Sequence, residues 1–311
     1  MKKQQYNVVA DTYVVKEDNT LIRLNKLEEG DLIRNSQGLL SEVVSVTKKK
    51  TEPIYEINDE FNSLVVHGNT HLKIKRNNKI YYSMVKDLKL NDEIIHSFNK
   101  TIPLCQLNDT LTVNDLKIII DERFVLLLGQ VFKYSNRTSN QLEIIIKDYQ
   151  FRNNILSWLE DEEYDYYYNW DESEDFNNQE IIIKDKKLLS ILDALFVFKN
   201  GEPTTLPDFL YYSSTPTILV KFLTSLTGNY KSYFTSRILL NKLQALMILH
   251  SMPYSIKDSI FTGYNNINLE NVDYYSTKIQ QLKLINLEYI SVLKLNTDVG
   301  ILTSFGQLKP E

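Results

Sequence analysis

The sequence contains a single cysteine, Cys105, among its 311 residues. One thiol can form neither an internal disulfide nor a zinc site built from cysteine pairs, which fits a reducing compartment. Only 9 glycines are present, and the chain has no Gly-rich phosphate loop, no Gly-x-Ser-x-Gly elbow and no His-Glu-x-x-His segment. These absences exclude the familiar signatures of phosphate-loop enzymes, serine hydrolases and zinc proteases.

Long hydrophobic runs are also missing, because no stretch approaches about 18 consecutive apolar residues. The first residues, MKKQQYNVVADTYVV, lack the long apolar segment and small-residue cleavage site of a secretory signal. We therefore expect no membrane partner and an intracellular location, in the cytoplasm or the nucleus. Hydrophobic residues make up 43% and charged residues 24% of the chain, which is typical of an ordered globular protein.

Positive charge is in slight deficit, with 35 Lys and Arg against 40 Asp and Glu and a formal net charge of -5. A dedicated nucleic-acid binder usually has an excess of basic residues, so this balance argues mildly against that class. Residues 160–175 hold nine acidic residues and no basic one. The acidity is therefore local, and the remaining surface has enough basic residues to form patches.

Short β-rich runs separated by turn residues fill the first hundred residues, and helical periodicity is absent there. This pattern predicts an all-β domain. The expected strands are 12–15, 21–24, 31–34, 42–46, 54–57, 63–66, 71–75, 80–85 and 93–96.

An internal repeat lies within this β-rich part. Residues 26–33, KLEEGDLI, match residues 87–94, DLKLNDEI, about 60 positions later. Both copies place Gly or Asn before an Asp, where a positive φ is favoured and the carboxylate can accept backbone N–H groups. The repeat predicts a β unit with approximate twofold symmetry.

Further along the chain, helical and strand patterns alternate. Residues 106–116 are expected to form a connector and residues 200–215 a turn-rich bridge between two units with the order helix–strand–helix–strand. The first unit is predicted as helix 117–133, strand 142–147, a helix starting near 150, strand 180–184 and helix 187–197. The second is predicted as helix 216–227, a strand in 230–236, helix 238–251 and a strand in 255–262. Residues 287–295 and 300–304 return to a strand pattern.

Four stretches of sequence resemble an intein that carries an inserted LAGLIDADG homing endonuclease. They are Asp11-Thr12-Tyr13-Val14-Val15 with the two repeated turns, Gly68-Asn69-Thr70-His71-Leu72, Leu127-Leu128-Gly129, and Leu206-Pro207-Asp208-Phe209-Leu210 followed by 219–228. Together these stretches are similar to the inteins of fungal vacuolar ATPases and to their freestanding relative, the yeast mating-type switching endonuclease.

The resemblance implies an α+β multidomain protein. An all-β, horseshoe-like Hint (Hedgehog/intein) domain would be formed by both chain ends, residues 7–105 and 281–311. A pseudo-twofold LAGLIDADG domain would be inserted at 117–280, in halves of about 117–200 and 201–280. Since the sequence begins with Met1, we expect a freestanding gene.

Splicing in this family requires a nucleophilic Cys or Ser at its first position, an activating histidine, and a His-Asn pair at its end. The resemblance puts Asn7 at the nucleophile position and Pro310 and Glu311 at the terminal pair, while His71 matches the activating histidine. An amide is not a nucleophile for this step, so we expect no splicing. The alternative for His71 is a hydrogen-bonding role in the β core.

Cleavage in this family requires one carboxylate at the end of each of two packed helices, which together hold Mg²⁺. The resemblance puts Tyr134 and Thr227 at those positions, and neither can replace a carboxylate. The small residues at the helix contact are replaced by Gln130, Lys133, Lys221 and Phe222, from which we expect a looser pair. We expect no bound metal and no cofactor, with Mg²⁺ needed only if the endonuclease is active.

Double-stranded DNA is the partner that the resemblance implies, read by two antiparallel sheets. The candidate contacts, whose alternative is ordinary solvated charge, are Lys133, Arg137, Asn140, Lys147, Lys231, Arg237, Lys242 and Lys257. Residues 160–176 would be repelled by phosphates. This segment is predicted to be either a solvated loop or a docking segment for a protein partner, with its aromatic side chains as anchors: Tyr166, Tyr167, Tyr168 and Trp170.

The leading hypothesis is a freestanding, monomeric, intein-derived pseudoenzyme. It would bind double-stranded DNA or act as a scaffold, with splicing and cleavage lost. One alternative is an active, site-specific endonuclease with divergent metal ligands. The other is a protein-interaction module that docks through residues 160–176.

Overall fold

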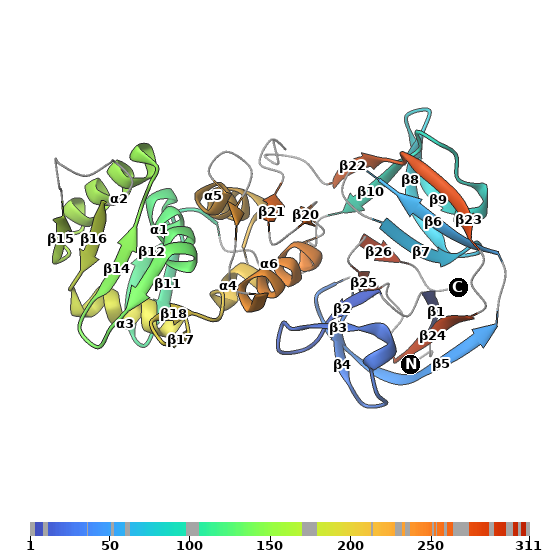
Figure 1. The fold of residues 1–311 in the computed structure, drawn as a ribbon, viewed down its shortest axis with the longest axis horizontal. Coiled ribbons are helices and arrows are strands. Elements are labelled where there is room, and N and C mark those ends of the chain that lie inside the picture. Colours follow the sequence, from blue (N-terminus) through green and yellow to red (C-terminus); the bar gives the residue numbers. More distant parts are fainter. Residues whose placement is uncertain are drawn as a thin grey trace. The chain divides into compact units, whose positions relative to one another are not determined.

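The computed structural model gives an α+β protein in which strands outnumber helices (Figure 1). It describes residues 4–8, 12–35, 37–50, 53–59, 63–97, 106–169, 179–212, 214–227, 232–233, 237–250, 252, 254–257, 260–263, 274–285, 289–296, 301–303 and 306–308. The chain divides into two compact units. Unit 1 comprises Met1–Ile102, Asn241–Ser255 and Asn271–Glu311, and unit 2 comprises Pro103–Leu240 and Ile256–Glu270.

Unit 1 is built from strands of both chain ends. Its largest sheet has the order β23-β6-β7-β1-β24-β5-β4, and a second has the order β22-β10-β8-β9. The strands are β1 (Gln4–Val8), β2 (Tyr13–Val15), β3 (Leu21–Arg23), β4 (Leu32–Arg34), β5 (Leu40–Lys50), β6 (Ile54–Asn58), β7 (Ser63–His67), β8 (His71–Arg76), β9 (Lys79–Met84), β10 (Glu93–Ser97), β22 (Tyr274–Lys278), β23 (Gln281–Ile285), β24 (Tyr289–Leu295), β25 (Ile301–Thr303) and β26 (Gly306–Leu308).

All nine strands predicted for the first hundred residues are present, but β1, β22, β23 and β26 were not predicted. The early part of the chain joins the late part through antiparallel pairs of β1 with β24, β5 with β24, β6 with β23 and β10 with β22. Residues 274–280, which the sequence assigns to the inserted domain, thus pair within unit 1.

The predicted internal repeat has the same hydrogen bonds in both copies. Short 3-10 helices, η1 (Leu24–Lys26) and η2 (Val85–Asp87), precede the two turns. Gly30 and Asn91 have positive φ angles of 90° and 68°. The next residue, Asp31 or Asp92, accepts the backbone N–H three residues earlier at 2.8 Å in each copy. The repeated sequence therefore codes for a repeated capped turn, as predicted.

Matching apolar positions of the two copies meet in one core. Leu24, Leu27 and Ile33 in the first copy correspond to Val85, Leu88 and Ile94 in the second, and all six are buried. Leu293 and Leu295 of β24 are buried in the same cluster. The late strands therefore complete a core that the first hundred residues begin.

Unit 2 contains most of the helices. They are α1 (Glu122–Tyr134), α2 (Tyr149–Asp161), α3 (Lys186–Leu195), α4 (Asp208–Tyr212) and α5 (Pro216–Thr227), while the division between the units falls within α6 (Arg237–Leu249). The strands are β11 (Thr110–Val113), β12 (Leu116–Ile119), β13 (Ser135–Arg137), β14 (Leu142–Ile145), β15 (Tyr166–Asn169), β16 (Glu180–Ile183), β17 (Phe198–Lys199), β18 (Glu202–Pro203), β19 (Ser232–Tyr233), β20 (Tyr254–Lys257) and β21 (Ile260–Gly263), with the division also passing through β20.

The first predicted helix begins later than expected. Residues 116–119 form β12, which pairs with β11 through a turn at Asn114 and Asp115, both at positive φ. The expected connector 106–116 is therefore mostly a β-hairpin. α1 begins only after Asp121, whose carboxylate accepts the Phe124 N–H at 2.7 Å.

The acidic segment also contains regular structure. Tyr166–Asn169 form β15, an edge strand of the sheet β13-β14-β16-β15. The expectation of an irregular solvated loop is therefore wrong for these four residues, while Trp170 lies outside the described residues. Within the described part of the chain, no helix has the length and hydropathy needed to cross a membrane.

Candidate functional site

α1 is the central helix of unit 2. It packs against α5, α2 and β14, and every side chain from Phe124 to Phe132 is buried (Figure 1). Phe124 contacts Trp158 of α2, with ring centroids 5.6 Å apart. Phe132 contacts Phe222 of α5 at 6.3 Å. The helix pair α1–α5 thus carries the positions at which the sequence resemblance implies metal ligands.

The two helices approach closely at Gly129. A Cβ atom at this position would lie 2.7 Å from Ser225 Cβ and 3.0 Å from the Phe222 backbone oxygen. Real side chains do not tolerate such distances, so only glycine fits here. The expectation of a looser pair is wrong at this crossing, because Gly129 faces the small Ser225 and leaves room for a close approach.

Polar side chains link the helices instead of separating them. The Ser225 hydroxyl donates to the Leu126 carbonyl at 2.6 Å. Gln130 Nε2 donates to Ser225 Oγ at 3.1 Å and also to the Ser225 carbonyl. Both side chains are almost fully buried. Because buried polar groups are costly when unpaired, these bonds favour one register of the pair.

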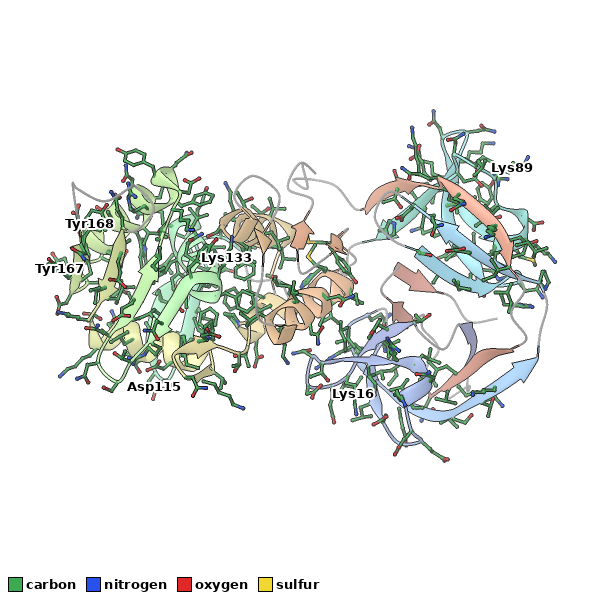
Figure 2. The ribbon with its side chains drawn as sticks, viewed as in Figure 1. Lys16, Lys89, Asp115, Lys133, Tyr167 and Tyr168 are labelled. Carbon is green, nitrogen blue, oxygen red and sulfur yellow. The ribbon has the colours of Figure 1, made fainter. Side chains whose placement is uncertain are left out.

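The amine of Lys133 lies at the carboxyl-terminal ends of α1 and α5. Lys133 Nζ donates to the Leu226 carbonyl at 2.6 Å, and the ammonium lies 4.5 Å from the centre of the Tyr134 ring. Figure 2 shows Lys133 on α1, on the side of α5. A cation is favourable at a helix carboxyl terminus, where the last carbonyls carry partial negative charge.

Burial shifts the pKa values of Lys133 and Tyr134. Desolvation, with a smaller contribution from the charge of Lys147, lowers the pKa of Lys133 to about 8. Burial raises the pKa of Tyr134 above its usual value, so the phenol stays protonated at neutral pH. Thr227 ends α5, and its side chain lies outside the described residues.

No group of three or more His, Cys, Asp or Glu side chains that could hold a metal ion occurs in the described part of the chain. Glu122 lies at the amino-terminal end of α1, where it forms an exposed ion pair with Lys221 at 2.6 Å. Such a surface pair contributes little to stability, about 0–1 kcal/mol.

Comparison with known proteins returns only partial likenesses. No protein-family model and no curated protein matches the chain. The matching solved structures include inteins and an intein-like domain, and the TM-scores of these matches are too low to establish a shared fold. The Msm DnaB1 intein splicing domain, solved with zinc, is 13% identical at a TM-score of 0.24, over 28% of this chain and 66% of that one. The likeness spans just under two thirds of that domain.

Two further solved structures give similar values. The intein-like domain from Clostridium thermocellum is 11% identical at a TM-score of 0.25, over 29% of this chain and 67% of that one. The DnaB intein from Synechocystis is 11% identical at a TM-score of 0.24, over 31% of this chain and 70% of that one.

Two of the splicing positions that the resemblance implies, Asn7 and His71, are among the described residues, and both lie in unit 1. Asn7 is in β1, opposite Val292 of β24. His71 begins β8, opposite Met84, and is partly buried. Pro310 and Glu311 lie outside the described residues. Of the other histidines, His67 accepts the Asn69 N–H through Nδ1 at 3.3 Å.

The candidate DNA contacts do not form one group. Arg137 is paired bidentately with Asp193, at 2.8 and 2.7 Å, and lines a cavity of about 470 Å³ together with Asn140. Lys147 is exposed after β14, whereas Lys242 belongs to unit 1 and donates to the Asp18 carbonyl at 3.2 Å. Arg237 and Lys257 are described by their backbone alone, and Lys231 lies outside the described residues.

A second surface was not predicted from the sequence. The sheet β13-β14-β16-β15 buries Leu142, Ile144, Ile181 and Ile183 on one face. The alternate residues lie on its other face, which we call the open face; it carries Asn136, Glu143, Ile145, Tyr167, Glu180 and Ile182. The alternation in LEIIIK and EIIIK indicates strands with one buried and one exposed face. Which residues lie side by side on the exposed face depends on the strand register, which the sequence does not give.

Proposed function

We propose that this chain is an intein-derived scaffold protein without splicing or cleavage activity. Unit 1 corresponds to a Hint-like domain and unit 2 to a LAGLIDADG-like domain. The observation that carries the proposal is the Lys133 ammonium bonded to the Leu226 carbonyl, at the helix ends where that family holds its metal ions.

Electrostatics argues against metal binding at this point. Phosphodiester hydrolysis of this kind needs a divalent cation that stabilises the attacking and leaving oxygens. Mg²⁺ requires hard, anionic oxygen ligands. The described residues offer an ammonium and a protonated phenol there, and a positive charge repels a second cation. Cleavage by this helix pair is therefore unfavourable.

The splicing half of the proposal rests on Asn7. A splicing nucleophile must be a thiol or hydroxyl activated by a nearby base. The amide of Asn7 cannot attack the preceding carbonyl in this way, and His71 alone supplies no nucleophile. Unit 1 then serves as a stable β framework.

The choice between scaffold and DNA binder rests on the sheet of unit 2. In the family that the sequence resembles, such a sheet reads DNA bases and contacts phosphates. Here its open face carries Glu143 and Glu180, whose charges repel a phosphate backbone. The geometry therefore favours a scaffold that binds a protein over one that binds double-stranded DNA.

A nuclease assay tests the loss of cleavage. The purified full chain is incubated with a fragmented genomic DNA library and either Mg²⁺ or EDTA, and cut ends are sequenced. We expect the same ends in both samples. Mg²⁺-dependent cuts at defined sites would overturn the proposal in favour of an active endonuclease, provided that the cleavage activity co-elutes with the chain in gel filtration. Cuts that persist in Tyr134→Ala and Thr227→Ala variants would locate the active site elsewhere.

Splicing is tested separately. The chain is expressed between two different reporter proteins, and the products are analysed by intact-mass spectrometry. We expect only the uncut three-part fusion. A ligated pair of reporters would contradict the assignment of Asn7 to the nucleophile position.

A further inference from the structure

The open face combines acidic and apolar side chains in a fixed register. Glu143 on β14 lies opposite Asn136 on β13 and Ile182 on β16, and Ile182 lies opposite Tyr167 on β15. In the next row, Ile145 lies opposite Glu180. Two carboxylates and three apolar side chains therefore occupy neighbouring positions on one surface.

Both carboxylates lack a cationic partner within the described residues. Glu143 accepts from Asn136 Nδ2 at 2.9 Å and from Gln141 Nε2 at 2.7 Å, so neutral amides orient it. The Glu180 carboxylate has no hydrogen bond or ion pair to any described residue. Burial raises the pKa of Glu180, and the nearby negative charge of Glu143 adds a smaller contribution.

The apolar side chains on this face remain accessible. Ile145 is 39% exposed and Tyr167 is 55% exposed. Figure 2 shows Tyr167 and Tyr168 on the same edge strand. They have different surroundings: Tyr168 donates to Gln179 Oε1 at 2.7 Å and stacks on the Arg152 guanidinium, on the other face of the strand. Tyr167 is thus the tyrosine of β15 that lies on the open face.

We infer that the open face of the sheet β13-β14-β16-β15 is a docking surface for a basic, apolar segment of a partner protein. This inference rests on the proposed scaffold function and names the surface and the chemistry of its partner. Lysine or arginine side chains would pair with Glu143 and Glu180, and apolar side chains would cover Ile145, Ile182 and Tyr167. Aromatic anchors next to charge are typical of such interfaces.

Charge argues against three other possible occupants of the open face. DNA would bring phosphates next to two carboxylates. Residues 170–178 of the same chain contain four acidic residues and no basic one. A second copy of this face would oppose its own glutamates. Only a partner with the opposite charge gains from both carboxylates.

Peptide binding by the full-length chain tests this inference. The probe is a fluorescein-labelled 12-residue peptide that alternates lysine and leucine, and the readout is fluorescence anisotropy. We expect the double variant Glu143→Gln, Glu180→Gln to weaken binding by roughly tenfold, about 1.4 kcal/mol. Tyr167→Ala should weaken it as well. The matched control, Glu162→Gln with Glu202→Gln, removes the same charge from exposed positions of unit 2 and should bind like the wild type.

Isoleucine methyl NMR locates the contact independently of affinity. We expect the methyl signals of Ile145 and Ile182 to shift when the peptide is added. Equal weakening by both double variants, or methyl shifts confined to other isoleucines, would overturn the inference. Tighter binding of a 20-base-pair DNA duplex to the same face would overturn it in favour of DNA. If the peptide tests fail but the nuclease assay still detects no cleavage, the docking surface is wrong and the proposed loss of cleavage stands. The failure of this inference can therefore be distinguished from the failure of the proposed function.

Discussion

Buried polar residues define the contact between α1 and α5. The Ser225 hydroxyl and the Gln130 amide are both almost fully buried, and their hydrogen bonds cross from one helix to the other. A sliding or rotation of one helix would break these bonds and leave polar atoms unpaired, at a cost of about 1–3 kcal/mol each. Gly129 is the residue that allows the approach.

Adding one methyl group at the crossing should therefore be costly. We expect Gly129→Ala to lower the free energy of unfolding by roughly 1–3 kcal/mol, because the new Cβ would overlap Ser225 and the Phe222 backbone. Urea denaturation followed by circular dichroism measures the effect. Ser225→Gly in the Gly129→Ala background should recover part of the loss. An unchanged midpoint for Gly129→Ala would contradict the close crossing.

A buried histidine in unit 1 should make stability depend on pH. His96 lies within 2.9 Å of Thr277 Oγ1, which donates to Asp59 Oδ2 at 2.7 Å. Since the hydroxyl proton goes to Asp59, the neutral imidazole donates through Nε2. Burial lowers the pKa of His96 to about 3, against about 6.5 for an unfolded histidine.

The direction of this pH dependence follows from the number of protons that the folded and unfolded chains bind. Between these two pKa values the unfolded chain binds a proton at this residue and the folded chain does not, so stability falls as the pH is lowered below about 6.5. We expect His96→Gln to flatten the slope of unfolding free energy between pH 6.5 and 5 by up to about 1.4 kcal/mol per pH unit. Carboxylates titrate mostly below this window. Parallel curves for the variant and the wild type would contradict the assignment.

Among the elements, the first three helices of unit 2 begin with the same kind of cap. Asp121, Asp148 and Asp185 precede α1, α2 and α3, and each carboxylate accepts the backbone N–H three residues later, at 2.7, 3.0 and 2.8 Å. The caps explain why α2 and α3 begin close to their predicted positions. They also explain the late start of α1, because the β12 strand must end before Asp121 can cap the helix.

Removing one cap tests this account. We expect Asp121→Ala to destabilise the chain by about 1 kcal/mol, because the Phe124 N–H loses its acceptor at the start of the central helix. Asp121→Asn keeps a side-chain oxygen at the same place and should lose much less. Chemical denaturation of the two variants makes the comparison. Equal losses in both variants would point to the charge of Asp121 rather than to its cap.

For the whole molecule, the division into two units predicts separate responses to core mutations. Leu293 lies in the core of unit 1, and Leu128 lies in the buried helix α1 of unit 2. Each truncation to alanine should cost about 2–5 kcal/mol in its own unit. Hydrogen exchange read by mass spectrometry should show Leu293→Ala weakening protection in unit 1 and Leu128→Ala in unit 2. Loss of protection in both units from either variant would mean that they unfold as one.

Short-range patterns in this chain were reliable guides where the signal is local. The nine early strands follow from β-rich runs bounded by turns, and the repeated Gly/Asn-Asp turn has the same hydrogen bonds in both copies. The hairpin at 110–119 was missed because its second strand, LKII, continues without a break into an apolar helical sequence. The turn residues Asn114 and Asp115 were the overlooked signal.

Tertiary structure alone settled the matters that depend on distant residues. Composition and periodicity suffice for the α+β class, because residue type and local period are written in the chain. The Gly129–Ser225 contact, the Lys133–Leu226 bond and the open face depend on which helix crosses which and on strand register. These arise from packing between residues far apart in sequence, and no local pattern encodes them.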